Sequence, residues 1–174
     1  TKNARYSNRK GNTPRYKAIA SLLAQIYRAV DIPLSIDVFG LTAYHKGDKN
    51  CLGQSLEHMA PHEDAISHML YLANWPAHVW ENPEPERTHA MVHNAILRLR
   101  KRLGDHIAIR PLLQGFRYRA QNFGVDFIEN QIHAATTAGS SGYLFWNQSG
   151  KYGPVSTAWR RQIVPHILTP KPAM

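Results

Sequence analysis

Cysteine is almost missing from this chain of 174 residues, which contains only Cys51. A single cysteine cannot close a disulfide within the chain, and it leaves no cysteine cluster to hold zinc. Cys51 lies in the polar stretch Lys-Asn-Cys-Leu-Gly-Gln, and we interpret it as a bystander thiol rather than a nucleophile. The chain also lacks any run of about 18 apolar residues, so we expect no membrane span. A disulfide scaffold and a cysteine-based zinc domain are therefore excluded.

Acidic residues are scarce, with 12 Asp and Glu against 21 Lys and Arg, and the net charge is +9. Such a balance suits a nucleic-acid binder, but the distribution of charge matters more than its sum. The basic residues fall in the N-terminal tail, at 98–102 and at 160–161, and no nucleic-acid-binding motif accompanies them. We interpret them as a solvated helix face with basic tails and expect no nucleic-acid partner.

The first twelve residues, TKNARYSNRKGN, contain no apolar stretch of the kind found in signal peptides. The chain begins with Thr rather than Met, so we expect a fragment or a processed product, and the compartment stays open. Hydrophobic residues make up 43% and charged residues 19% of the chain. This composition and length are typical of one soluble globular domain with a core.

Helical and strand-like segments alternate along the chain. Apolar residues at helical spacing predict helices over 14–30, 86–103 and 125–138, and a short helix near 54–59. Thr13 before Pro14 is typical of a helix start, and Gly104 and Gly139 are typical stops. Short apolar segments predict strands at 34–40, 65–71, 107–113 and 142–147.

This alternation predicts parallel strands covered by helices. No Gly-x-Gly-x-x-Gly or Walker loop follows a strand, which disfavours an open, nucleotide-binding sheet. The loops after the strands are long and rich in polar and aromatic residues, as at the C-terminal face of a (β/α)₈ barrel. Four units are half of such a barrel, which has about 250 residues. We therefore predict an α/β fold, half of a (β/α)₈ barrel over residues 14–150, with a basic tail at 1–13 and a Pro-rich tail at 151–174.

Motifs mark the ends of the four strands: Asp-Val-Phe-Gly at 37–40, Met-x-Tyr at 69–71, Arg-Pro-x-x-Gln at 110–114 and Leu-x-Trp-Asn at 144–147. In this order they resemble a family of glycosyl-hydrolase domains with the TIM-barrel fold. The resemblance implies that these are the last four strands, the C-terminal half of the barrel. It also implies that a preceding strand, absent here, supplies a further carboxylate, and it suggests a cell-envelope or secreted location.

Two departures from the family pattern concern the second strand and the loop that follows it. His68 stands where the family tends to have proline, and Leu-Ala-Asn-Trp at 72–75 replaces a Pro-Ser-His-type run. These differences affect the expected substrate loop more than the fold.

Asp37 is the candidate catalytic residue. Glycoside hydrolysis uses two carboxylates, roughly 5–5.5 Å apart for retention or 6.5–9.5 Å for inversion. Of the twelve acidic residues, only Asp37 lies inside a predicted strand. It shares a face with Ser35 and Phe39, while Ile36 and Val38 point the other way and would pack under the helices, so we expect Asp37 to face inward. The alternative is a structural aspartate that binds a loop or an arginine.

Three further polar residues end strands. Arg110 cannot lose its charge, so it needs a carboxylate partner, either Asp37 or the missing upstream residue, and a purely structural ion pair is an equally open interpretation. Gln114 and Asn147 carry amides suited to sugar hydroxyls, and loop capping is the alternative for both.

Four aromatic residues are candidates for stacking against a sugar. Tyr71 and Trp146 end strands and could equally belong to the core at the top of the barrel. Trp75 and Trp80 lie in a loop, where exposed aromatic residues often mark binding. The histidine pairs 58/62 and 89/93 have helical spacing but no third ligand and no His-Glu-x-x-His setting, so we predict neither a metal site nor a cofactor.

Besides a basic nucleic-acid-associated domain, which salt-dependent binding of DNA would reveal, two functions remain in view. The first is a glycoside hydrolase that acts on a polysaccharide or glycan through carboxylate acid/base chemistry, of which this chain is an incomplete and inactive portion. The alternative is a non-catalytic carbohydrate-binding or scaffold barrel, and a carboxylate at the end of the upstream strand would favour the enzyme. In either case we expect the inward face, with Phe39, Met69 and either Phe145 or Trp146, to bind the missing N-terminal half or to self-associate.

Overall fold

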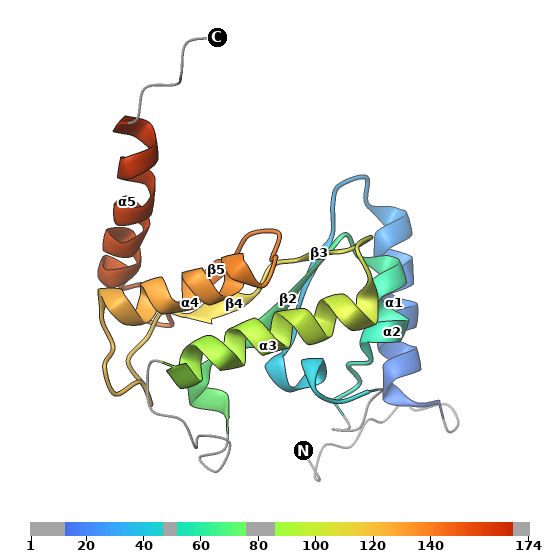
Figure 1. Ribbon diagram of the computed structural model, residues 1–174. Helices are drawn as coiled ribbons and strands as arrows, with labels where there is room; N and C mark the ends of the chain where they lie inside the picture. The colour runs from blue at the N-terminus through green and yellow to red at the C-terminus, as the bar shows by residue number, and fades with distance from the viewer. Residues whose placement is uncertain (1–12, 47–51, 76–85, 169–174) are drawn as a thin grey trace.

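The structure is a computed structural model that describes residues 13–46, 52–75 and 86–168 (Figure 1). Its main strands are β1 (Ser35–Phe39), β2 (Ala65–Leu70), β4 (Leu112–Gln114) and β5 (Leu144–Trp146), and a two-residue strand, β3 (Ala108–Ile109), precedes β4. The longer helices are α1 (Arg15–Ala29), α3 (Glu86–Leu103), α4 (Val125–Thr137) and α5 (Gly153–Leu168). Short elements complete the order: η1 (Gly40–Ala43), α2 (Leu56–Met59), η2 (Ala60–His62) and η3 (Leu72–Asn74).

The strands form one parallel sheet in the order β1-β2-β4-β5, with β3 also pairing with β2. Strands that follow one another in sequence are therefore neighbours in space, as predicted. Asp37 lies opposite Ser67 in the register of β1 and β2, and Gln114 lies opposite Trp146 in that of β4 and β5. All the strand ends thus meet at one edge of the sheet.

The third predicted strand is interrupted. Its two pieces, β3 and β4, flank Arg110 and Pro111. The Arg110 N–H still donates to the Ile66 carbonyl, and the Pro111 carbonyl accepts from the Leu144 N–H. Proline has no N–H to donate to the ladder, so regular pairing stops there and resumes at Leu112. The expectation of one continuous strand over 107–113 is corrected accordingly.

Helices cover one face of the sheet. Val38, Ile66 and Leu113 point toward them and are fully buried. The helix α3 supplies an apolar stripe at helical spacing, which joins these strand residues in one core; the stripe consists of Val92, Ile96, Leu99 and Leu103. Burying one such aliphatic side chain contributes roughly 1.5–3 kcal/mol. This face therefore supplies most of the stability of the fold.

The helix ends follow the sequence closely. The predicted helix over 86–103 is α3, and α4 ends one residue before its predicted end. Gly104 and Gly139, with φ of 72° and 76°, have the left-handed backbone that glycine favours after a helix. At the start of α1, the N-cap position belongs to Pro14 rather than to Thr13. Among the described helices, none has the length and apolarity needed to cross a membrane.

The C-terminal segment differs from the prediction. Where a Pro-rich tail was expected, α5 forms a helix over Gly153–Leu168 that packs on α4 and, in Figure 1, stands off at the opposite end of the molecule from α1. Pro154 lies in the first turn, where a missing N–H costs nothing. Ala158 is fully buried and Val155 packs against the core, so tertiary contacts hold the helix.

Candidate functional site

Within residues 13–46, 52–75 and 86–168, no helix covers the second face of the sheet. We call it the open face and define it by the side chains that alternate with the core residues along the strands: Ser35, Asp37, Phe39, Met69, Leu144 and Trp146. Phe39 and Trp146 expose 43% and 50% of their surface, although both are large and apolar. These two residues lie on β1 and β5, the edge strands of the path β1-β2-β4-β5, so apolar surface is exposed at both edges of the open face.

Two glycines allow the strand ends at this edge to approach one another closely. A Cβ at Gly40 would lie 2.5 Å from the carbonyl oxygen of Met69, and one at Gly115 would lie 2.9 Å from that of Trp146. No side chain fits at either distance. The glycine of the Asp-Val-Phe-Gly motif is thus explained by the turn that brings η1 against β2, directly beyond Asp37.

Asp37 is exposed on the open face, on the side opposite Val38, as the alternation predicted. Among the described residues, no hydrogen bond or ion pair engages its carboxylate. Partial burial alone raises the pKa of Asp37 above its usual value. The carboxyl group therefore keeps its proton to a higher pH than an ordinary aspartate.

The expected pair between Asp37 and Arg110 is absent from the part of the chain that the structure describes. The Arg110 N–H binds the Ile66 carbonyl, so Arg110 lies level with Ser67 in the adjacent strand, while Asp37 lies level with Ser67 on the other side. Two strand spacings, roughly 10 Å, therefore separate the two backbones. The Arg110 side chain is exposed and keeps its hydration. A direct ion pair between the two side chains is therefore not formed, and a carboxylate upstream of this chain stays the other expected partner of Arg110.

Tyr71 is the residue that the structure does bring near Asp37. It is buried at the end of β2, and its ring meets Phe116 edge to face at 5.5 Å. The pKa of Tyr71 is raised above its usual value, first by burial, then by the negative charge of Asp37 and by Tyr152. Tyr152 also accepts a hydrogen bond of 3.2 Å from the Asn147 N–H through its hydroxyl oxygen. Sequence reasoning missed Tyr152 because it fell within the predicted tail.

Gln114 and Asn147 cap loops. The Gln114 side chain accepts a hydrogen bond from the Ala73 N–H at 3.0 Å and donates to the carbonyls of Phe116 and Tyr118, both at 2.9 Å. The Asn147 amide nitrogen donates to two carbonyls, those of Gly115 and Lys151. Its oxygen accepts from Ser149. Of the two interpretations left open by the sequence, these contacts support loop capping rather than binding of sugar hydroxyls.

The three tryptophans expected to bind a sugar lie in different surroundings. Trp146 is half-exposed on the open face, as a stacking platform would be. Trp75 is only 6% exposed and its ring lies against Tyr44 at 4.8 Å, so the expectation that it stands in solvent is wrong. Burial of the large apolar surface of the Trp75 ring stabilises the fold more than exposure of the ring in a loop would. Trp80 lies outside the described residues.

The sequence indicated the pair His89 and His93, but not the third histidine that lies beside them in the structure. His89 and His93 of α3 stack at 5.5 Å, and His133 of α4 joins them, with its Nδ1 3.3 Å from Nε2 of His89. Within the described residues, no group of three or more His, Cys, Asp or Glu side chains is arranged to hold a metal ion.

Residues 1–152 match the model of a protein family described as a putative glycosyl hydrolase domain. Comparison with curated proteins finds no match.

Among solved structures, the chain is similar to the PgaB (BpsB) glycoside hydrolase domain from Bordetella bronchiseptica, with a TM-score of 0.59 and 10% identity over 90% of this chain and 43% of that one. It is more distantly similar to bee venom hyaluronidase, solved with a hyaluronic acid tetramer, with a TM-score of 0.41 and 16% identity over 67% of this chain and 35% of that one. This chain thus spans less than half the length of either. The first likeness and the sequential parallel sheet confirm the predicted fold class, half of a (β/α)₈ barrel.

Proposed function

The chain belongs to the glycosyl hydrolase domain family, and from this premise we propose that it is part of a glycoside hydrolase in which Asp37 supplies one of two catalytic carboxylates. One observation carries the proposal: Asp37 is the acidic residue of the described strands, and its carboxylate has no partner among the described residues while it lies on the open face near the strand ends. A structural aspartate would hold a loop or an arginine.

The environment of Asp37 suits acid catalysis. A general acid must hold its proton near the working pH and release it in the transition state, and partial burial raises the pKa of Asp37 in that direction. The Tyr71 hydroxyl lies close enough for the charge of Asp37 to raise the pKa of Tyr71. We assign Tyr71 to positioning the Asp37 carboxyl or the sugar oxygen that receives its proton.

The second carboxylate must come from elsewhere in the complete protein, because the described part of the open face holds no other. Its distance from Asp37 would decide between retention and inversion of the anomeric centre. The substrate would be a polysaccharide or glycan, whose sugar rings have apolar faces. Trp146 and Phe39 offer exposed aromatic surface on the same face as Asp37, and we assign them to sugar stacking.

The test is Asp37→Asn in the full-length protein, assayed for hydrolysis across a panel of polysaccharides and glycans. Loss of a general acid lowers turnover by about 10²–10⁴-fold, and we expect kcat to fall in that range with KM little changed. Asp126→Asn is a matched control, since that side chain is 97% exposed on α4. Circular dichroism should show both variants folded. Equal activity of Asp37→Asn and wild type would assign Asp37 to a structural role.

A non-catalytic carbohydrate-binding barrel is the second candidate. It is favoured by the strand-end amides, since Gln114 and Asn147 are fully engaged by loop backbone and leave few polar groups for orienting a substrate. In this case Trp146→Ala would weaken binding of the glycan while Asp37→Asn would leave it unchanged, and no glycan in the panel would be hydrolysed. Glycan-array binding with both variants separates the two functions.

A further inference from the structure

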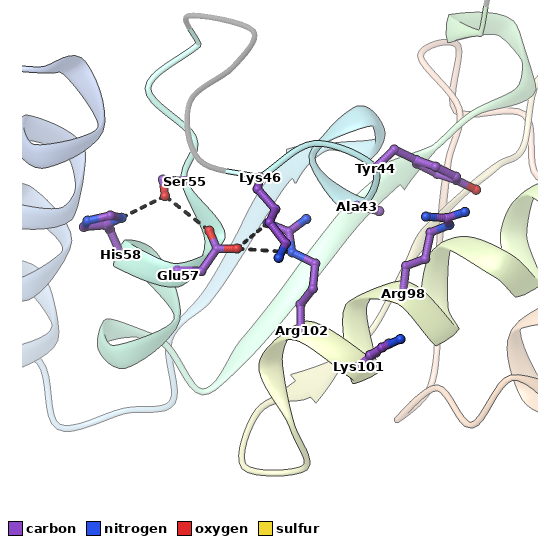
Figure 2. A pocket seen from close by; sticks show the side chains of 9 residues that line it. All are labelled: Ala43, Tyr44, Lys46, Ser55, Glu57, His58, Arg98, Lys101 and Arg102. Carbon is purple, nitrogen blue, oxygen red and sulfur yellow. Dashed lines mark hydrogen bonds and ion pairs between the residues drawn. The ribbon is translucent and has the colours of Figure 1, made fainter.

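A second concave site lies on the helix-covered side, between η1, α2 and α3. It is a cavity of about 750 Å³, within the range of roughly 300–1,000 Å³ typical of small-molecule sites. None of its lining residues belongs to the open face, so its occupant would not compete with a sugar at Asp37. Figure 2 shows the side chains that line it: Lys46, Glu57 and Arg102 lie together at one side, and Arg98 points toward Tyr44 at the other.

Positive charge dominates this cavity. Lys46, Arg98, Lys101 and Arg102 line it, and Glu57 is the only acidic residue among the lining side chains. The Arg102 guanidinium binds Glu57 at 2.6 Å, and Arg102 also donates to the Thr42 carbonyl. This contact compensates Arg102 and holds the pKa of the Glu57 carboxyl below its usual value, even though burial opposes the shift. The other three cations form no ion pair with a carboxylate of the described residues.

The walls of the cavity are held in place by contacts with the core. The Arg98 guanidinium lies 4.9 Å from the centre of the Tyr44 ring, which in turn packs edge to face on buried Trp75. A guanidinium stacked in this way keeps its N–H edge available for a ligand. On the opposite wall, the buried Ser55 hydroxyl lies 2.8 Å from Nδ1 of His58. Arg98 is thus oriented before any ligand arrives, which lowers the entropy cost of ordering this side chain on binding.

We propose that this cavity binds a divalent tetrahedral oxyanion, a phosphate or sulfate group, either free or carried on a small molecule. Three uncompensated cations around one cavity match a group of about two negative charges better than a single carboxylate, which would leave most of the positive charge unpaired. Arg98 would bind two oxygens through its guanidinium edge, and Lys46 and Lys101 would act as mobile point charges. The proposal is independent of the glycoside hydrolase assignment.

Titration calorimetry on the full-length protein tests the proposal with sodium phosphate, sodium sulfate and, at matched ionic strength, sodium acetate and sodium chloride. We expect saturable binding of phosphate or sulfate and none of acetate or chloride. Binding of phosphate alone assigns the site to phosphate groups, and binding of both assigns it to divalent oxyanions in general. Absence of a saturable signal with either anion would overturn the proposal.

Two double variants distinguish the cavity from general attraction to a basic protein. Arg98→Gln with Lys101→Gln should weaken binding by at least about tenfold, because charge-assisted hydrogen bonds are lost. Arg160→Gln with Arg161→Gln removes the same charge from α5, far from the cavity, and should change the dissociation constant by less than about twofold. Equal losses in both double variants would show that net charge alone attracts the anion and would overturn the proposal.

Discussion

The two faces of the sheet use the same strands in opposite ways. On the helix-covered face, Val38, Ile66 and Leu113 are fully buried in one core, while on the open face their neighbours Phe39 and Trp146 expose about half of their surface. Successive strand residues point to opposite faces, so stability and binding are assigned to alternate positions of one short sequence. The open face can therefore change its chemistry without loss of the core beneath it.

Two ionisable side chains are exceptions to this apolar packing. Both are buried, and neither has a hydrogen-bond partner among the described residues. His68 of β2 is completely buried with neither ring nitrogen bonded within the described residues, and burial, followed by the charge of Arg102, lowers the pKa of His68 to about 3. Glu63, just before β2, is likewise buried and unbonded there, and burial raises the pKa of Glu63 to about 8. Both groups are neutral in the folded protein over a wide range of pH.

The two faces should differ most in how far truncation of one side chain lowers the free energy of unfolding, tested at one residue of β4 and one of β5. Leu113→Ala removes fully buried volume and should lower the free energy of unfolding by about 2–5 kcal/mol. Trp146→Ala, one position farther along the sheet and half-exposed, should lower it by less than about 1 kcal/mol. Urea unfolding followed by circular dichroism measures both. Similar losses would mean that the open face is packed in solution.

The two buried ionisable groups next to the core should make the stability of the protein depend on pH. Below the usual histidine pKa of 6.5, His68 binds a proton in the unfolded chain but not in the folded protein, where it stays neutral down to about pH 3. The free energy of unfolding therefore falls as the pH drops from 6.5 to 3. Above the usual glutamate pKa of 4.5, unfolding releases a proton that Glu63 holds up to about pH 8, so stability falls as the pH rises. Between 4.5 and 6.5 the two effects cancel.

We therefore predict that His68→Leu removes a contribution of roughly 1.4 kcal/mol per pH unit between about pH 3 and 6.5, so that the stability of this variant falls with rising pH from 4.5 onward. Glu63→Gln removes a contribution of similar size and opposite sign between about pH 4.5 and 8. Unfolding free energies from urea titrations at half-unit intervals of pH measure both slopes. His106→Gln, at an exposed position, is the control and should leave the curve unchanged. A His68→Leu curve parallel to that of wild type would show that His68 has bonding partners in solution.

Substitutions on the open face should change the free energy of unfolding least, but they should clearly reduce self-association of the chain. The exposed apolar residues of the open face should make this chain, expressed alone, self-associate or bind the rest of its barrel. Phe39→Ser with Trp146→Ser should shift it toward a monomer while changing the free energy of unfolding by about 1 kcal/mol or less. Size-exclusion chromatography with light scattering decides the matter. A monodisperse wild-type monomer with fixed near-ultraviolet aromatic signals would contradict the prediction.

Local sequence patterns predicted the elements and faces of this fold better than its contacts. Hydrophobic periodicity located α3 and the parallel strands, and alternation in β1 placed Asp37 opposite the core. Two expectations differ from the structure because they depended on neighbours distant in sequence. Trp75 packs against Tyr44 instead of standing in solvent, and α5 forms a helix that packs on α4. The catalytic role of Asp37 stays a prediction.

The Gln114 side chain links the loops that follow β2 and β4. It holds these loops only through main-chain groups, the Ala73 N–H and the carbonyls of Phe116 and Tyr118. The side chains of Ala73, Phe116 and Tyr118 take no part in these three bonds. A substitution at one of these positions therefore leaves the hydrogen bonds to Gln114 in place as long as the main chain keeps its path.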